Sequence, residues 1–221
     1  MNWYKSANLL DEIKNFGPNS PVETIDDPRV AYISEKYEIP LDKSFEWLRK
    51  KLISEEFKRE YFAAEYGWSV PDKKAIKEIQ EFIGGDSVLE IGAGYGMWAK
   101  LMQDAGISIT PTDSFSNRGA FVPLDKSFTN IEDANANKAI GKYRNHNVLM
   151  IVWPPYCDPF AANSLKKFTG NKLIFIGEGY KGCTADDEFF DILTNEWSRI
   201  KRVDIPRWVC KHDSLELWVR I

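Results

Sequence analysis

VLEIGAGYG, residues 88–96, is the stretch of this chain that most strongly predicts its fold. A short apolar run at positions 88–91 leads into glycines at 92, 94 and 96, and helix-forming sequence follows from 97 to 105. That order predicts a strand, a tight turn and a helix. Because glycine allows positive φ angles and a helix start presents free N–H groups, the turn is suited to hold a ligand against the backbone.

The spacing of the glycines distinguishes between two kinds of ligand. A dinucleotide fingerprint, G-x-G-x-x-G, would place its third glycine at Met97, so that pattern is not met. Instead, the acid Glu90 precedes G-x-G-x-G, and a second acid, Asp113, ends the next predicted strand, 21 residues after Gly92. One turn, one helix and one strand need roughly 20 residues, so the two acids are expected at the same edge of a sheet.

These two acids and the glycine triplet resemble the first motifs of the class I S-adenosylmethionine-dependent methyltransferases. The resemblance covers residues 71–221. It implies that S-adenosyl-L-methionine is the cofactor, that Asp113 takes the ribose hydroxyls, and that the turn contacts the cofactor through Glu90, Gly92, Ala93, Gly94 and Gly96. The alternative is an ordinary strand–helix turn in an α/β protein whose ligand is different or absent.

Length and composition fit one globular domain with an extension. The chain has 221 residues, of which 43% are hydrophobic and 28% charged. A net charge of −4 does not favour nucleic acid as a partner. Neither a membrane-length apolar run nor a signal-peptide pattern is evident, and the three cysteines are far apart, so we expect a cytoplasmic protein without membrane contact. The oligomeric state is not indicated.

Residues 1–70 are predicted to form a helical extension, which serves either as packing or as a lid. Helical spacing runs over 3–16, residues 19–40 look like a loop rich in proline, and helices follow from Asp42 and Ser54. Tyr66 and Trp68 flank a glycine just before the main domain. We expect both rings to contact the acceptor, with burial in the core as the alternative.

Residues 71–221 alternate between helical and strand patterns. Helices are expected over 72–83, 97–105 and 161–168, and residues 182–188 are expected to open another, with Thr184 as a possible cap, that continues through Trp197. Strands are expected over 88–91, 107–113, 127–131, 148–153, 172–176, 200–205 and 214–221. This predicts a three-layer α/β sandwich around a seven-stranded, mostly parallel sheet. The resemblance adds that the last strand runs antiparallel, and that Glu132 and Asp133, after the third strand, contact the adenine.

The fourth predicted strand ends in Trp153-Pro154-Pro155-Tyr156. This tetrapeptide resembles the Asp/Asn-Pro-Pro-Tyr motif of methyltransferases that act on amino groups of adenine or glutamine. The resemblance implies that Tyr156 stacks on a planar acceptor and that the other three residues also contact it, with Trp153 touching the cofactor as well. Trp153 departs from the motif, because an indole offers only an N–H donor and cannot accept a hydrogen bond from an amine. Backbone carbonyls or Asp158 could replace the missing acceptor, or the target atom is a different one.

Three further residues complete the expected site. Glu178 follows the fifth predicted strand between two glycines, and Trp208 and His212 lie in the connection before the last strand. His212 beside Asp213 is a possible pair for proton transfer, and His212 or Glu178 is the expected general base. No metal is expected. The predicted function is methyl transfer to a small or planar acceptor; the alternatives are a methyltransferase acting on nucleic-acid bases and a cofactor-binding protein without catalysis.

Overall fold

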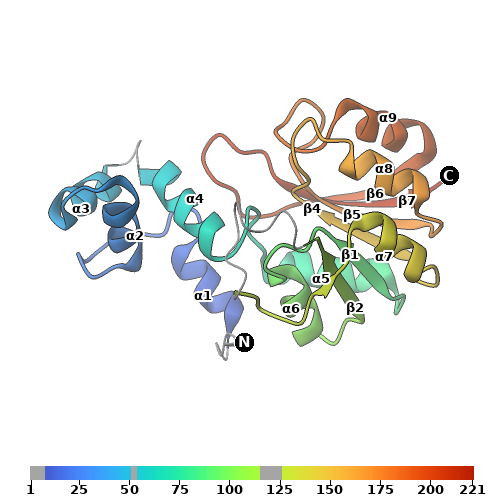
Figure 1. Ribbon diagram of the computed structural model, residues 1–221, viewed down its shortest axis with the longest axis horizontal. Helices are drawn as coiled ribbons and strands as arrows, with labels where there is room; N and C mark the ends of the chain where they lie inside the picture. The colour runs from blue at the N-terminus through green and yellow to red at the C-terminus, as the bar shows by residue number, and fades with distance from the viewer. Residues whose placement is uncertain (1–7, 51–53, 115–125) are drawn as a thin grey trace.

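A computed structural model describes residues 8–50, 54–114 and 126–221 (Figure 1). Its centre is one seven-stranded sheet with the strand order β3-β2-β1-β4-β5-β7-β6. The glycine turn follows the central strand β1. The strands are β1 (Val88–Ile91), β2 (Ile109–Asp113), β3 (Glu132–Asp133), β4 (Val148–Val152), β5 (Lys172–Gly177), β6 (Trp197–Asp204) and β7 (Ser214–Arg220).

Only β7 runs against its neighbours. The pairs β2–β3, β1–β2, β1–β4 and β4–β5 are parallel, whereas β7 pairs antiparallel with both β5 and β6. The expected α/β sandwich with an antiparallel last strand is therefore confirmed. Since parallel strands place their carboxyl ends at one edge, the ends of β1, β4 and β5 lie together with the loop that leads into β7.

Helices cover both faces of the sheet, as parallel strands require (Figure 1). One face packs against α5 (Lys73–Ile83) and α6 (Met97–Asp104), through apolar side chains such as Ile79 and Met102. The other face packs against α7 (Ala136–Lys142), α8 (Phe160–Lys167) and α9 (Asp187–Glu196), through side chains such as Leu165 and Phe189. The sheet with these five helices is called the sheet domain below.

The N-terminal extension is built from two parts. Helix α1 (Leu9–Phe16) and the second half of α4 (Ser54–Glu65) add Ile13, Phe62 and other side chains to the core of the sheet domain. Helices α2 (Pro28–Tyr37) and α3 (Leu41–Arg49) lie apart, at the left end of Figure 1. Residues 20–50, here called the outer lobe, have a small core of their own made of Val22, Val30, Ile33 and Leu48.

The expected loop over 19–40 was wrong, because α2 occupies its second half. Pro28 stands at the start of that helix, where its missing N–H costs nothing, and the Asp27 side chain caps the helix by accepting a hydrogen bond from the backbone N–H of Arg29 at 2.9 Å. Pro28, which was interpreted as part of a loop, therefore marks the start of a helix.

The third strand was also misplaced. Residues 127–131 form no strand, and β3 consists only of Glu132 and Asp133, paired with Thr112 and Asp113. The preceding segment crosses the start of α6: Phe128 N–H donates to Tyr95 O at 2.9 Å, and the side chains of Thr129 and Ile131 lie against Gly96. Helix α9 likewise stops at Glu196, so that Trp197 opens β6 instead of continuing the helix.

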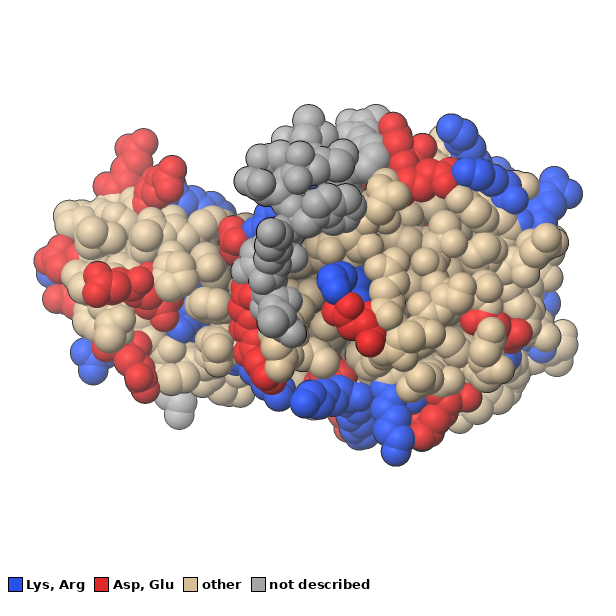
Figure 2. Space-filling model, turned by 90° about the horizontal axis from the view of Figure 1, so that it is seen from below, with Lys and Arg blue, Asp and Glu red and all other residues tan. Residues whose placement is uncertain are grey.

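The surface has no continuous basic stripe on the described part of the face in Figure 2. Acidic side chains gather over the outer lobe at the left end, and basic side chains stand in separate groups along the edges of the sheet domain. No helix among the described residues is long and apolar enough to cross a membrane.

Candidate functional site

The glycine turn after β1 has the backbone conformation that its sequence predicts. Gly92, Gly94 and Gly96 all have positive φ, at 66°, 56° and 75°. A Cβ on Gly92 would meet the Phe160 ring at 3.2 Å, whereas a Cβ on Gly94 would have no atom of the described chain within 4 Å. Among the described residues packing therefore requires a glycine at 92 but not at 94, where the positive φ is the reason for glycine.

Asp113 lies directly across the turn. Its Oδ2 accepts a hydrogen bond from the backbone N–H of Gly94 at 2.7 Å, and Thr112 Oγ1 donates to Glu90 O at 2.9 Å. The ends of β1 and β2 are thereby locked together. Both acids that the sequence analysis assigned to the cofactor thus belong to one hydrogen-bonded turn.

Glu90 is the most unusual group in the turn. The side chain is 1% exposed, and its Oε2 has no hydrogen-bond partner among the described residues. Burial, with a further contribution from the nearby negative charge of Asp113, raises the pKa of the Glu90 carboxyl to about 8. Buried carboxylates without partners are costly, so this one calls for a ligand or a functional reason.

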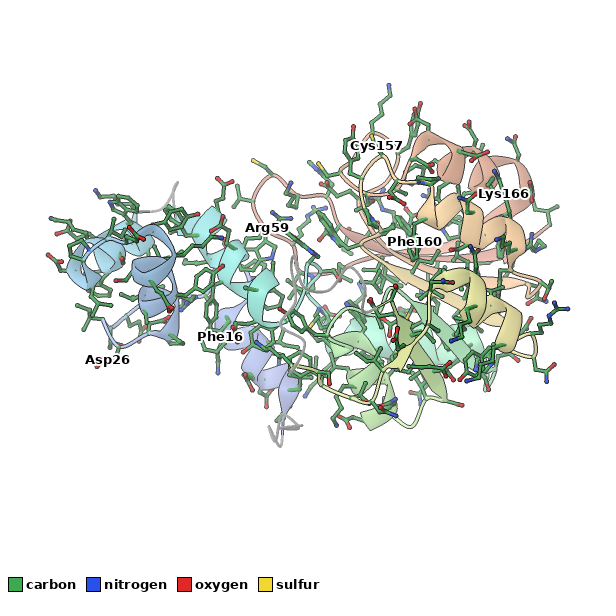
Figure 3. All side chains as sticks on the ribbon, viewed as in Figure 1. Phe16, Asp26, Arg59, Cys157, Phe160 and Lys166 are labelled. Carbon is green, nitrogen blue, oxygen red and sulfur yellow. The ribbon has the colours of Figure 1, made fainter. Side chains whose placement is uncertain are left out.

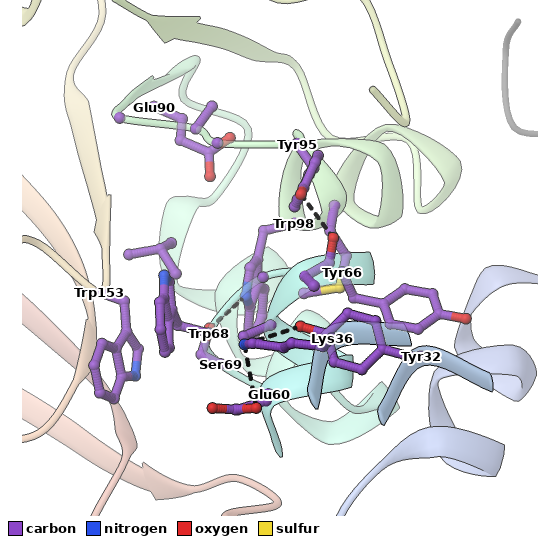
Figure 4. Close-up of a pocket in the computed structure, with 18 residues that line it drawn as sticks. Tyr32, Lys36, Glu60, Tyr66, Trp68, Ser69, Glu90, Tyr95, Trp98 and Trp153 are labelled. Carbon is purple, nitrogen blue, oxygen red and sulfur yellow. Dashed lines mark hydrogen bonds and ion pairs between the residues drawn. The ribbon is translucent and has the colours of Figure 1, made fainter. Parts of the chain in front are cut away.

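A cavity of about 450 Å³ opens beside the turn (Figure 4). Gly92, Ala93, Gly94 and Glu90 form its floor. Trp153 at the end of β4 forms one side, and Tyr66 and Trp68 come from the segment that follows α4. Seven residues predicted to bind cofactor or acceptor therefore line one cavity, although their roles stay predictions.

The N-terminal extension covers this cavity and is bonded to it. Tyr95 OH donates to Ala64 O at 2.7 Å, and Trp98 Nε1 donates to Ser69 Oγ at 2.8 Å. On the outer side three further lining residues come from the extension, where Lys36 pairs with Glu60 at 3.2 Å and also donates to Tyr32 OH at 3.4 Å. These contacts hold the extension against the cavity, and both interpretations of residues 1–70, as a lid or as packing, stay predictions.

A half-buried cation, Arg59, lies against the two tryptophans on the aromatic side of the cavity. The Trp68 and Trp153 rings stack with centroids 5.6 Å apart and planes 20° apart (Figure 4). Arg59 Cζ lies 5.0 Å from the Trp68 ring and 5.3 Å from the Trp153 ring. Trp153 has a φ of 47°, a left-handed conformation that costs of order 1–3 kcal/mol for a residue other than glycine. The surrounding packing therefore holds Trp153 in a strained position.

Glu178 and His212 belong to a second cavity, of about 590 Å³, on the far side of β5 and β7. Glu178 accepts backbone hydrogen bonds from Cys183 and His212, each at 2.9 Å. Burial opposes the charge of Glu178, but these N–H donors hold its pKa below the usual value. The His212 side chain is 76% exposed, and its Nδ1 lies 3.6 Å from Glu178 Oε1. Neither group lines the cavity at the glycine turn.

Several other predicted residues have structural contacts of their own. Asp158 Oδ1 accepts the Phe160 N–H at 2.8 Å at the start of α8, and Trp208 is buried against Phe62. Glu132 pairs with Lys142 at 2.8 Å and accepts from Tyr143 OH. The remaining four lie as follows: Asp133 is exposed beside Asp113 in the sheet, Pro154 is buried, Pro155 is exposed and Tyr156 is 65% exposed.

The sequence analysis missed the charged residues that the extension contributes. Lys36 lies in the segment interpreted as a loop, and Arg59 and Glu60 look like ordinary surface charges of an amphipathic helix. A helical spacing of Val30, Ile33 and Tyr37 was the available signal for α2. No local pattern marks Arg59, because its neighbours Trp68 and Trp153 are brought to it only by the fold.

Comparison with solved structures finds proteins with a similar chain course. A mutant of MtNAS in complex with S-adenosylmethionine matches 96% of this chain and 89% of its own at 13% identity, with a TM-score of 0.45. Magnesium protoporphyrin IX methyltransferase from Synechocystis, with S-adenosylmethionine bound, matches 92% of this chain and 100% of its own at 9% identity and a TM-score of 0.43. TehB from Haemophilus influenzae matches 73% and 66% at 14% identity and a TM-score of 0.45.

No sequence-family profile matches the chain, and no curated protein matches it either. The described residues contain no group of three or more His, Cys, Asp or Glu side chains that could hold a metal ion. The fold class therefore stands on the strand order, and function has to be argued from the residues of the cavity.

Proposed function

We propose that this protein is an S-adenosylmethionine-dependent methyltransferase. The observation that carries the proposal is Glu90, a buried carboxyl with an unpartnered oxygen, on the floor of a cavity formed by a glycine turn. S-adenosylmethionine bears a cationic amino group that would supply the missing partner. Asp113, fixed at the other side of the same turn, would accept hydrogen bonds from the two ribose hydroxyls.

The turn and the cavity fit this cofactor chemically. Gly92, Ala93 and Gly94 line the cavity with backbone, and α6 begins directly after this turn, where a helix has free N–H groups for a ligand. When bound, the cofactor supplies a methyl group on a positively charged sulfur. The protein's own contribution is to align the acceptor and to keep water away, since methyl transfer depends mainly on geometry and electrostatics.

The proposed acceptor is small or planar and binds at the Trp153 side of the cavity. Stacked Trp68 and Trp153 offer π faces, and the N-terminal extension closes the cavity from outside. A cavity of this size, covered by helices, suits a modest acceptor better than a long polymer. The separate groups of basic side chains on the face in Figure 2 also favour a small molecule over nucleic acid.

Calorimetric titration of the purified chain with S-adenosylmethionine and S-adenosylhomocysteine, beside NAD and ATP, tests the proposal. We expect micromolar binding of the first two only. Asp113→Ala should weaken that binding by about tenfold or more, because hydrogen bonds to a charged group contribute about 1.5–3 kcal/mol. Asp104→Ala, at the end of α6 away from the turn and ion-paired with Lys100, is the control and should bind normally.

Two results would overturn the proposal. One is binding of NAD or ATP without binding of S-adenosylmethionine, because the turn would then serve another ligand. The other is equal weakening by Asp113→Ala and Asp104→Ala, which would mean that the effect comes from the fold and not from the site.

A further inference from the structure

Asp213 is a buried carboxyl beside Trp153, which lines the cavity at the glycine turn, and the site described so far does not use it. It is 1% exposed and immediately precedes β7. Neither Asp213 oxygen has a hydrogen-bond partner among the described residues, and the same is true of Trp153 Nε1 and Arg59 Nε. Native proteins rarely leave such groups unpaired, and four atoms in one place call for an additional polar group between them.

These unpaired atoms belong to one cluster, made of Arg59, Trp68, Trp153 and Asp213, which we call the Arg59 cluster. Arg59 reaches into it from α4, between the extension and the sheet domain (Figure 3). Burial raises the pKa of Asp213 to about 6; the Trp153 N–H and the positive charge of Arg59 oppose that effect, and the negative charge of Glu178 adds to it. Asp213 therefore interacts with both Trp153 and Arg59: the Trp153 N–H lies close enough to lower the pKa of the carboxyl, without the geometry of a full hydrogen bond.

The chemistry of the unpaired atoms defines what would satisfy them. Asp213 offers only acceptor oxygens, whereas Trp153 Nε1 and Arg59 Nε offer only donors. A complementary group therefore presents one N–H donor next to one acceptor nitrogen or oxygen. Planar amides and amino heterocycles have that pattern, and their faces suit the neighbouring tryptophan rings. Because Arg59 balances the charge of Asp213, the cluster fits a neutral group better than a cation.

We propose that the Arg59 cluster recognises the acceptor. The Asp213 carboxylate accepts a hydrogen bond from the N–H of the amino or amide group that is to be methylated. Arg59 or Trp153 donates to the adjacent ring nitrogen or carbonyl oxygen. Asp213 thereby takes the part that the Asp or Asn of an Asp/Asn-Pro-Pro-Tyr motif would have and that Trp153 cannot perform. Asp158 already accepts the Phe160 N–H through Oδ1, whereas both Asp213 oxygens lack a partner among the described residues.

This inference rests on the proposed methyl transfer. In that step the lone pair of the acceptor nitrogen forms the new bond to the methyl carbon. The bond between that carbon and sulfur breaks, and its electron pair stays on sulfur, which becomes neutral. The N–H proton of the methylated nitrogen passes to Asp213, so that the charge of the product is discharged inside the site.

Binding to a dead-end complex tests the assignment without turnover. The full chain saturated with S-adenosylhomocysteine is titrated with adenine and nicotinamide, and with the dimethylated forms of the same two compounds, which lack the N–H. We expect adenine or nicotinamide to bind, and its dimethylated form to bind at least about tenfold more weakly, because a buried acceptor would be left unpaired.

Substitutions assign the effect to residues. Asp213→Leu removes both acceptor oxygens at similar volume; it should weaken binding of the probe about tenfold and leave the affinity for S-adenosylhomocysteine unchanged. Arg59→Lys, which keeps the charge but loses the Nε–H, should weaken binding of the probe as well, and it serves if Asp213→Leu fails to fold. Asp204→Leu, at an exposed acid at the end of β6, is the matched control.

The outcomes separate the two proposals. If S-adenosylhomocysteine does not bind, the methyltransferase assignment itself fails. If it binds but neither adenine nor nicotinamide binds the complex, the acceptor class assigned here is wrong, and water alone fills the cluster. Equal binding of the dimethylated forms, or unchanged binding to Asp213→Leu and Arg59→Lys, would overturn the role of the Arg59 cluster.

Discussion

The outer lobe and the sheet domain are stabilised in different ways. The outer lobe buries only four aliphatic side chains in its own core, and its largest buried side chain is a charged one, Arg29. Arg29 contacts both oxygens of Asp27, Ser20 Oγ and Pro21 O at 2.6–2.9 Å. The sheet domain instead buries apolar side chains on both sheet faces.

The outer lobe and the sheet domain also differ in whether their buried charged side chains have hydrogen-bond partners. In the outer lobe every described polar atom of Arg29 has a partner, because a small core cannot offset the cost of an unpaired charge. In the sheet domain Glu90 and Asp213 are buried with unpartnered oxygens. A large apolar core tolerates such groups, and both of them lie beside the candidate site. Arg29 therefore stabilises the fold, whereas Glu90 and Asp213 are the buried charged groups available to a ligand.

The largest expected effect is on the outer lobe. Arg29→Met should cost about 3–5 kcal/mol, since it leaves Asp27 and buried acceptors without their cation. Hydrogen exchange should show the outer lobe opening while the sheet domain stays protected. Arg49→Met, on exposed α3 and over the Phe45 ring, is the control and should cost less than about 1 kcal/mol. Uniform loss of protection across the chain would contradict the prediction that the outer lobe opens separately from the sheet domain.

In the sheet domain, the buried Glu90 carboxyl is expected to make the folded state less stable as pH rises. The folded pKa of Glu90, about 8, lies above the unfolded value of 4.5, so stability should fall as pH rises between these values. Between pH 4.5 and 7 this amounts to about 3 kcal/mol. Glu90→Gln should remove that part of the slope in denaturant titrations, whereas Glu81→Gln, 59% exposed, should not. Parallel pH profiles for the wild-type chain and Glu90→Gln would refute this.

Two glycines allow backbone strain to be separated from ligand binding. Gly94 and Gly84 have φ values of 56° and 62°, and a Cβ at either position would meet no described atom within 4 Å. Both changes to alanine should therefore cost about 1–2 kcal/mol of stability. Only Gly94→Ala should also weaken S-adenosylmethionine binding in calorimetry, because Gly84 ends α5 away from the cavity. Loss of binding in both variants would show that strain alone is responsible.

The smallest effect is expected where the sheet domain meets the extension. Tyr95→Phe removes the hydrogen bond to Ala64 O and should cost about 1 kcal/mol in denaturant unfolding. Tyr180→Phe, with a side chain 60% exposed, is the control and should be neutral. A cost for Tyr95→Phe no larger than for the control would mean that this contact does not hold the extension to the glycine turn.

The sequence predicted those parts of the fold that depend on local patterns. The strand, glycine turn and helix from Val88 to Asp104 were placed correctly, because glycine spacing and apolar periodicity are read within a short window. The loop assigned to residues 19–40 failed, since a proline at a helix start and a proline in a loop look alike without the Asp27 cap. β3 failed because two residues of pairing leave no periodic signal.

The sequence predicted which residues lie at the edge of the sheet, but not which cavity each of them lines. The ends of β1, β4 and β5 were expected at one edge of the sheet, but that edge is wide enough for two cavities, and Glu178 faces the second. Position at a strand end does not tell which cavity a side chain lines. Arg59 and Asp213 lie 154 residues apart in the chain, so only tertiary structure brings them together.

The left-handed backbone of Trp153 shows what the position would gain from another residue type. Asparagine tolerates that conformation far better than tryptophan does, and Asn is one of the two residues that open an Asp/Asn-Pro-Pro-Tyr tetrapeptide. Trp153→Asn would relax the backbone and create that tetrapeptide in a single substitution, at the expense of the stack with Trp68. The backbone strain at Trp153 therefore accompanies the placement of an indole ring, and not a smaller amide, beside Trp68.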